Sequence, residues 1–137
     1  MARALTFQVA GHLLSLAGAG RREVVERGAV VPLPHGEPLL LGLTAVHGRS
    51  VPLLSVAALL GHGPDALTPG GLTLLAEEGG EEVALAVDSV GEFAEVTPVS
   101  GDADPLGEAP TPGDPRPLHL PALMRLLRQQ LAPGSRA

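Results

Sequence analysis

The sequence feature that most constrains the fold is a pair of short apolar runs, separated by a glycine turn and followed by a capped helix. The runs at residues 39–46 and 51–54 have the length and the aliphatic composition of buried strands. Gly48 between them suits the tight turn of a β-hairpin. Ser55 can then cap a short helix, and Gly61 can end that helix in a left-handed conformation. The stretch predicts strand, turn, strand and short helix in succession.

Two further hairpins are predicted on either side of this stretch. Residues 5–9 alternate apolar and polar side chains with a period of two, and residues 13–17 return as a second strand. Residues 72–77 and 82–87 repeat this arrangement around a Gly-Gly pair. A chain that uses one β-rich module twice is expected to pack two small barrels together, because barrels close their own sheet edges.

The last third of the sequence predicts one more strand that belongs to no hairpin, then a loop and a C-terminal helix. Residues 92–96 are expected to form a strand with Phe93 directed inward. Residues 98–117 are dominated by glycine, proline and aspartate, which predicts a long loop. Residues 116–120 predict a last short strand, and residues 121–131 predict a helix that begins with proline and carries one apolar stripe.

Two stretches between these elements are predicted to be connectors. Residues 21–27 indicate either a polar connector or a single helical turn, and residues 61–71 have the glycine and proline content of a linker. A length of 137 residues suits one domain. We therefore expect an all-β fold in a single domain over residues 4–131, divided near residues 61–71 into two barrel subdomains, with a tail at residues 132–137.

The composition disfavours several classes of function. The formal net charge of −6 opposes binding to nucleic acid or to anionic membranes. With two phenylalanines and no tryptophan or tyrosine, the chain has few side chains on which bases could stack. The absence of cysteine excludes disulfides, a thiolate nucleophile and a cysteine metal cage. No apolar run approaches the ~20 residues of a membrane span, so we expect a soluble, cytoplasmic protein without membrane insertion.

The sequence lacks the common motifs of catalytic and metal sites. None of the five histidines lies three or four residues from another on a predicted helix, and no serine occupies a G-x-S-x-G elbow. For Asp88, which follows an apolar strand, a structural and a functional interpretation have equal weight. We therefore expect no catalytic residue, no metal and no cofactor. The one enzymatic alternative is a small β-barrel hydrolase that uses His47 and Asp88 with a metal.

The central stretch resembles the signature of CheW-like domains, which combines a glycine, an apolar run, Arg-Gly, Val-Pro and a helix. The matching residues are Gly42-Leu43-Thr44-Ala45-Val46-His47-Gly48, then Val51-Pro52-Leu53-Leu54, and finally a Leu-Leu-Gly ending. The resemblance covers residues 5–131. It departs from the family at His47, where arginine is usual, and at Ser55, where aspartate is frequent.

This resemblance implies two five-stranded barrels packed side by side, with short helices that include a C-terminal one. CheW-like domains are non-catalytic scaffolds that connect the cytoplasmic tips of methyl-accepting chemoreceptors to the regulatory domain of a CheA-type histidine kinase. The resemblance therefore implies a signalling adaptor in chemotaxis or in pilus-based surface motility. A degenerate CheW-like subunit of another signalling complex is the alternative with the same fold.

The resemblance also implies where partners bind. In the family, receptors bind along the groove between the barrels, and the matching residues here are Glu23, Val24, Val25, Gly42, Leu43, His47 and Gly48. A barrel end meets the kinase, and the matching residues are Val87, Asp88 and Val90. An acid and the arginine near the groove can pair in the family, so Glu23 is expected to face His47, which is a pH-dependent partner.

The segment at residues 102–117 departs from the family pattern. Typical members have a strand here before the last helix, whereas this chain is rich in proline, which removes donors from a β-ladder. We therefore expect one barrel to be open or shorter on this side, with a free sheet edge. The altered side is expected to have lost a partner or gained a lineage-specific one.

Overall fold

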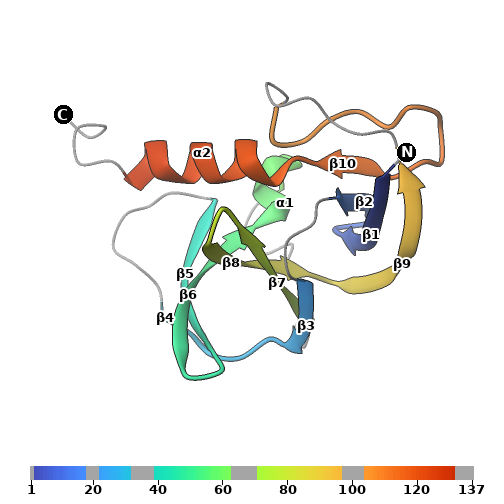
Figure 1. Ribbon diagram of the computed structural model, residues 1–137. Helices are drawn as coiled ribbons and strands as arrows, with labels where there is room; N and C mark the ends of the chain where they lie inside the picture. The colour runs from blue at the N-terminus through green and yellow to red at the C-terminus, as the bar shows by residue number, and fades with distance from the viewer. Residues whose placement is uncertain (1, 18–21, 32–38, 63–70, 97–103, 132–137) are drawn as a thin grey trace.

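The computed structural model describes residues 2–17, 22–31, 39–62, 71–96 and 104–131, and these residues form two β-sheets and two helices (Figure 1). In chain order the elements are β1 (Ala2–Val9), β2 (His12–Ala17), β3 (Arg22–Glu26), β4 (Val30–Val31), β5 (Leu40–Val46), β6 (Arg49–Ser55), α1 (Val56–Leu59), β7 (Leu72–Glu78), β8 (Glu81–Val87), β9 (Ser89–Val96), β10 (Arg116–Leu118) and α2 (Leu120–Leu131). In Figure 1, α2 lies along the upper side of the molecule, above α1 and strands β5 to β8.

The first sheet has four strands in the order β10-β2-β1-β9. Strand β1 is antiparallel to both β2 and β9, and β10 runs parallel to β2. Ala10 and Gly11 connect β1 to β2 with φ angles of 50° and 82°. Positive φ at both residues is typical of a two-residue hairpin turn. The predicted first hairpin is therefore confirmed.

The second sheet has six strands in the order β3-β7-β8-β6-β5-β4. Its hairpins β5–β6 and β7–β8 are the two that the sequence predicts, and β6 lies parallel to β8 between them. Strands β3 and β4 occupy the two outer positions although only residues 27–29 separate them in the chain. The sheet therefore curls until its two edges approach each other, as Figure 1 shows.

The main hydrophobic core lies between the two sheets and beneath α2. Its largest fully buried side chains include Phe7 and Leu14 from the first sheet, Leu85 from the second and Leu123 from α2. A second, smaller cluster lines the other face of the six-stranded sheet and consists of Val46, Val51, Leu53, Leu75, Ala84 and Ala86. Residues 83–87 of β8 are consequently buried on both faces, which explains their unbroken apolar sequence.

The all-β prediction with two subdomains is confirmed, and the described strands divide four and six between the sheets instead of five and five. The short helix α1 begins as predicted, because Ser55 accepts a hydrogen bond from the Ala58 amide at 3.2 Å. Helix α2 begins at Leu120, one residue before the predicted start. His119 caps it, since its Nδ1 atom accepts from the Ala122 amide at 3.2 Å.

Two sequence predictions are wrong. Residues 22–26 form strand β3 and not a connector or helical turn, because their backbone pairs with the whole length of β7. Phe93 is 54% exposed and does not point into the core. It lies on β9 at the outer edge of the first sheet, where its ring packs under the guanidinium of Arg3, with 5.0 Å between the guanidinium carbon and the ring centroid.

The segment at residues 104–115, which we call the strap, has no regular strand, in agreement with its proline content. The first sheet has four described strands and is not closed, in agreement with the shorter, open barrel expected on this side, but the outer edge of β10 is not free. Leu106 forms an isolated bridge with Leu118, and the Gly107 amide donates to the carbonyl of Pro117 at 2.9 Å. Because the strap folds back on β10, it covers the outer edge of that strand. Residues 97–103 of the predicted loop, and the linker at residues 63–70, lie outside the described part of the chain.

Candidate functional site

The β5–β6 hairpin places a histidine at its tip. His47 and Gly48 form the turn, with φ angles of 52° and 78°. Both values belong to the left-handed region, which Gly48 adopts without strain and which histidine tolerates better than β-branched residues do. The turn holds the imidazole beyond the last pair of the ladder, Val46 and Arg49. His47 is therefore exposed and fixed in position by the hairpin backbone.

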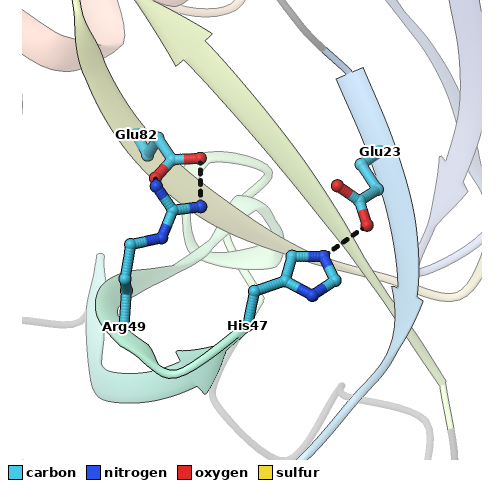
Figure 2. A network of polar contacts seen from close by, with 4 residues as sticks. All are labelled: Glu23, His47, Arg49 and Glu82. Atoms are coloured by element: carbon cyan, nitrogen blue, oxygen red, sulfur yellow. Dashed lines mark hydrogen bonds and ion pairs between the residues drawn. The ribbon is translucent and has the colours of Figure 1, made fainter.

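Glu23 and His47 are in contact, as expected from the family resemblance. The Nε2 atom of His47 lies 2.6 Å from Oε2 of Glu23 (Figure 2). Glu23 comes from β3, at the edge of the sheet opposite β4, and pairs in register with Leu75 of the small inner cluster. The side chain therefore projects into the opening of the curled sheet, where the hairpin tip meets it. The contact joins two segments that are 24 residues apart in the chain.

A second ion pair beside the first was not predicted from the sequence. Arg49 meets Glu82 of β8 through two bonds, Nη1 to Oε1 at 2.7 Å and Nη2 to Oε2 at 3.1 Å (Figure 2). The fork of a guanidinium matches a carboxylate in this way. Both ion pairs together tie the β5–β6 hairpin to β3 and β8.

The other residues matched to the receptor groove do not share one surface. Val24 is 43% exposed and lies on the face of β3 opposite to Glu23, in register with Leu74 of the main core. Val25 and Leu43 are half-buried, and Gly48 is exposed at the turn. Gly42 is buried where the β5–β6 register shifts, and its φ of 152° favours glycine. Gly42 therefore shapes the strand and presents no side chain to a partner.

The residues matched to the kinase side lie at the bend between β8 and β9. Val87 is fully buried in the main core. The Asp88 carboxylate accepts a hydrogen bond from the Ala10 amide at 2.8 Å, and the Asp88 amide donates to the Gln8 carbonyl at 2.8 Å. Asp88 thus stabilises the β1–β2 turn, in which Ala10 has a positive φ. These contacts favour the structural interpretation of Asp88. Val90, two residues further along the chain, is half-buried.

Two arginines hold the backbone where the subdomains meet. Arg22 donates to the carbonyls of Ala17 and Glu77, and it therefore connects the end of β2 to β7. Arg27 donates to the carbonyl of Val87 at 2.7 Å. Burial lowers the pKa of both guanidinium groups, and the nearby carboxylates of Glu78 and Asp88 respectively act in the opposite direction. Both side chains stay charged, because an arginine pKa lies far above neutral pH.

Gly71 leaves the space that Arg27 requires. A Cβ atom at this position would lie 2.7 Å from Nη2 of Arg27 and 2.8 Å from the carbonyl oxygen of Val87. These distances are shorter than any real carbon contact, so any larger residue would displace the guanidinium. The glycine at the end of the predicted linker therefore has a packing role.

Among the described residues, no group of three or more histidine, aspartate or glutamate side chains could hold a metal ion. His47 is paired with Glu23, and Asp88 is bonded to the Ala10 amide in the other subdomain. The two groups that a metal-dependent hydrolase would use are thus held by different partners. The arrangement offers exposed, ion-paired hairpin surfaces, which suit contact with another protein.

The comparison with family models agrees with the resemblance read from the signature. The model of the CheW-like domain matches residues 3–113. The chain belongs to the CheW-like family. The match ends within the strap, so β10 and α2 of this CheW-like protein lie beyond it.

The fold of this CheW-like protein is similar to the crystal structure of the scaffolding protein TtCheW from Thermoanaerobacter tengcongensis. The two chains are 17% identical, with a TM-score of 0.62, and the similarity covers 85% of this chain and 86% of TtCheW. None of the curated proteins matches the sequence. In the described part of this CheW-like protein, no helix is long and apolar enough to cross a membrane. Family and fold together support a scaffold or adaptor role in chemotaxis-type signalling.

Proposed function

We propose that this CheW-like protein is a non-catalytic cytoplasmic adaptor that couples the tips of methyl-accepting chemoreceptors to the regulatory domain of a CheA-type histidine kinase. The observation that carries the proposal is the contact between Glu23 and His47, at 2.6 Å. It brings together the two segments that the family resemblance assigns to the receptor side, although they lie on different strands. A preformed contact of this kind costs little rearrangement on binding.

On the receptor side, the proposed surface combines side chains that touch the partner with residues that shape the strands. Val24, on one face of the edge strand β3, and His47, beside the other face, are both exposed, so a partner that wraps around this edge can contact both. Gly48 leaves the hairpin tip open, because no atom lies within 4 Å of the place where a Cβ would be. Glu23, Val25, Gly42 and Leu43 are half-buried or buried and support this surface from behind.

On the kinase side, the proposed contact is the bend between β8 and β9. Val90 is half-buried and Ser89 is exposed there, whereas Val87 anchors the bend in the core. Asp88 fixes the neighbouring β1–β2 turn through the Ala10 amide. The bend is therefore a rigid surface on the first subdomain, separate from the hairpin tip on the second. An adaptor requires two such separate surfaces.

A pull-down from a lysate that contains chemoreceptors and a CheA-type kinase tests the proposal. Val24→Glu places a charge on the proposed receptor surface, and Val31→Glu is the matched control, since Val31 is 63% exposed on the opposite edge strand β4. We expect wild type and Val31→Glu to recover both partners. Val24→Glu should lose receptor recovery by about tenfold or more, because burying an unpaired charge at an interface is costly.

A variant that stays folded, by circular dichroism, yet recovers receptor as well as wild type does would contradict the assigned surface. If folded wild-type protein recovers neither kinase nor receptor, the adaptor proposal itself fails. The second candidate, a CheW-like subunit of another signalling or pilus-motility complex, would then apply. The histidine at position 47, where the family usually has arginine, is the observation that favours this candidate.

A further inference from the structure

The strap and the first sheet enclose a pocket of about 140 Å³. It is lined by Ser15 of β2, Glu95 and Val96 of β9, Pro117 of β10, and Pro110, Asp114 and Pro115 of the strap. Strands β9 and β10 are the two outer strands of the four-stranded sheet, yet both line the same pocket. In Figure 1 the segment that leads into β10 passes beside the end of β9. The pocket therefore lies where an additional strand would have completed a barrel.

Among the described residues that line this pocket, the polar side chains are almost all hydrogen-bond acceptors. Three of these seven residues are prolines, which have no backbone N–H to donate. Glu95 and Asp114 contribute carboxylates, which accept and do not donate when ionised, and Oδ2 of Asp114 already accepts from the Thr111 hydroxyl, which leaves Oδ1 for a ligand. The hydroxyl of Ser15 is the one side-chain donor among the lining residues. A ligand that donates several hydrogen bonds and carries positive charge would therefore complement the pocket.

Ser15 gives the pocket a buried polar floor. The residue is 2% exposed and lines the pocket, and its oxygen is not among the fully buried polar atoms of the described residues that lack a partner. It lies in register with Pro117 on one side and with Thr6 on the other. The hydroxyl is positioned to bond a group that enters the pocket.

The neighbouring basic side chains do not neutralise the pocket. Arg3 lies opposite Glu95 in the β1–β9 ladder, but its guanidinium packs on the ring of Phe93. The Nε atom of Arg116 donates to the Gly107 carbonyl at 2.9 Å, and this side chain lines a neighbouring hollow that shares Pro110 with the pocket. Neither arginine lines the pocket itself.

We propose that this pocket binds a small primary amine in its protonated form, with the ammonium group between the carboxylates of Glu95 and Asp114 and the Ser15 hydroxyl. Val96 and the three prolines contact the alkyl part. The size is suitable, since an engineered protein cavity of about 150 Å³ holds a benzene molecule. The site is distinct from both proposed partner surfaces, because Glu95 and Val96 lie at the end of β9 that is far from the bend with β8, and Glu23 and His47 belong to the second sheet.

Binding of n-butylammonium to the full-length chain, followed by two-dimensional NMR, tests the proposal. n-Butanol and butyrate serve as neutral and anionic probes of the same length. We expect n-butylammonium to give saturable shifts at Ser15, Val96 and Asp114 with a dissociation constant of about 1 mM or tighter. n-Butanol should bind about tenfold more weakly, because it lacks the charge-assisted hydrogen bonds. Butyrate should not bind.

Two variants and a matched control locate the site. Glu95→Gln removes one carboxylate charge at constant shape, and we expect it to weaken n-butylammonium binding about five- to tenfold. Ser15→Ala should weaken it about threefold. Glu108→Gln removes a carboxylate from the strap outside this pocket and should leave binding unchanged.

The proposal is overturned if n-butylammonium gives no saturable shifts in the folded wild-type protein. It is equally overturned if n-butanol binds as tightly as n-butylammonium, since the pocket would then be a solvent-filled hollow without charge selectivity. The same holds if Glu108→Gln weakens binding as much as Glu95→Gln does, because the effect would then come from the overall charge of the chain. Failure of any of these tests leaves the adaptor proposal unaffected.

Discussion

The β5–β6 hairpin and the strap lie at the ends of their sheets and are held there in opposite ways. The hairpin is a regular ladder closed by a two-residue turn, and side-chain ion pairs connect it to β3 and β8. The strap has no ladder, and backbone contacts to β10, together with Arg116, hold its ends. The hairpin lies in the segment that carries the family signature, whereas the strap is rich in proline and has no regular strand. The fold therefore tolerates the absence of regular structure in the strap, as long as the main core beneath β10 is kept.

The largest effect on the free energy of unfolding is expected at Leu118 of β10, which follows the strap and packs in the core. Leu118 is 2% exposed, packs in the main core and carries the bridge to Leu106. Leu118→Ala should lower the free energy of unfolding by about 3 kcal/mol, through lost burial and the cavity that remains. Leu13→Ala, at a position that is 37% exposed, is the control and should cost about 1 kcal/mol or less. Equal losses in urea denaturation would show that the strap is not anchored through the core.

The next prediction compares two glycines that share a positive φ. Gly48 of the hairpin turn has φ 78° and Gly113 of the strap has φ 92°, and both have open space around them. Gly48→Ala should cost about 1–2 kcal/mol, because the left-handed turn sets the register of two strands. Gly113→Ala should cost about half as much, since the local Thr111–Asp114 bonds of an exposed turn can adjust. A larger loss for Gly113→Ala would reverse the contrast between the two ends.

A smaller, pH-dependent effect is expected at the start of α2. Burial lowers the pKa of His119, the charge of Arg125 lowers it further, and Glu78 acts in the opposite direction. Since the unfolded chain takes up this proton at about pH 6.5, stability should fall as the pH drops below that value. Protonation also removes the Nδ1 acceptor that caps the helix. His119→Asn keeps a capping acceptor that does not titrate, so its stability should depend less on pH between 7 and about 5.5.

Urea denaturation of wild type and His119→Asn at several pH values measures this difference. The two proteins differ only at residue 119, so the contributions of all other groups cancel in the comparison. If the two stability profiles run parallel over this range, the buried histidine does not contribute to the pH dependence. The hairpin at the other end should be unaffected by the substitution, because the second ion pair, between Arg49 and Glu82, contains no histidine.

The smallest effect is expected at the exposed ion pair of the hairpin. The His47 and Glu23 side chains are 52% and 26% exposed, so solvent screens their attraction. A double-mutant cycle with His47→Ala and Glu23→Ala should give a coupling of about 0.5 kcal/mol that decreases in high salt. A coupling above about 2 kcal/mol would mean that the contact stabilises the position of the hairpin itself. Its role would then go beyond shaping the surface that the partner contacts.

The sequence predicts the hairpins because their determinants are local. Alternating side chains and glycines at the turns suffice for β1–β2, β5–β6 and β7–β8, and Ser55 caps α1 for the same reason. Strand β3 could not be predicted in this way. Its arginine and glutamates look solvated in the sequence, and only pairing with β7, which is about fifty residues away in the chain, makes it a strand.

The candidate site was predictable only in part. The family resemblance pointed to Glu23 opposite His47, but it gave no indication that Arg49 would reach Glu82. Phe93 was expected inward from its alternation along the strand, yet β9 is an outer strand and the core does not extend over it. The burial of Val87 on a strand with two buried faces likewise depends on the curl of the sheet. Such features arise from packing between distant segments.

If this protein is an adaptor, it must bind two partners at once. The measurement is sedimentation of the purified chain with a CheA-type regulatory domain and a receptor-tip fragment, separately and together. Our account predicts one species that contains all three proteins and that loses only the receptor fragment in Val24→Glu. If the folded chain binds no more than one of the two partners at a time, the account is contradicted, since an adaptor must hold both.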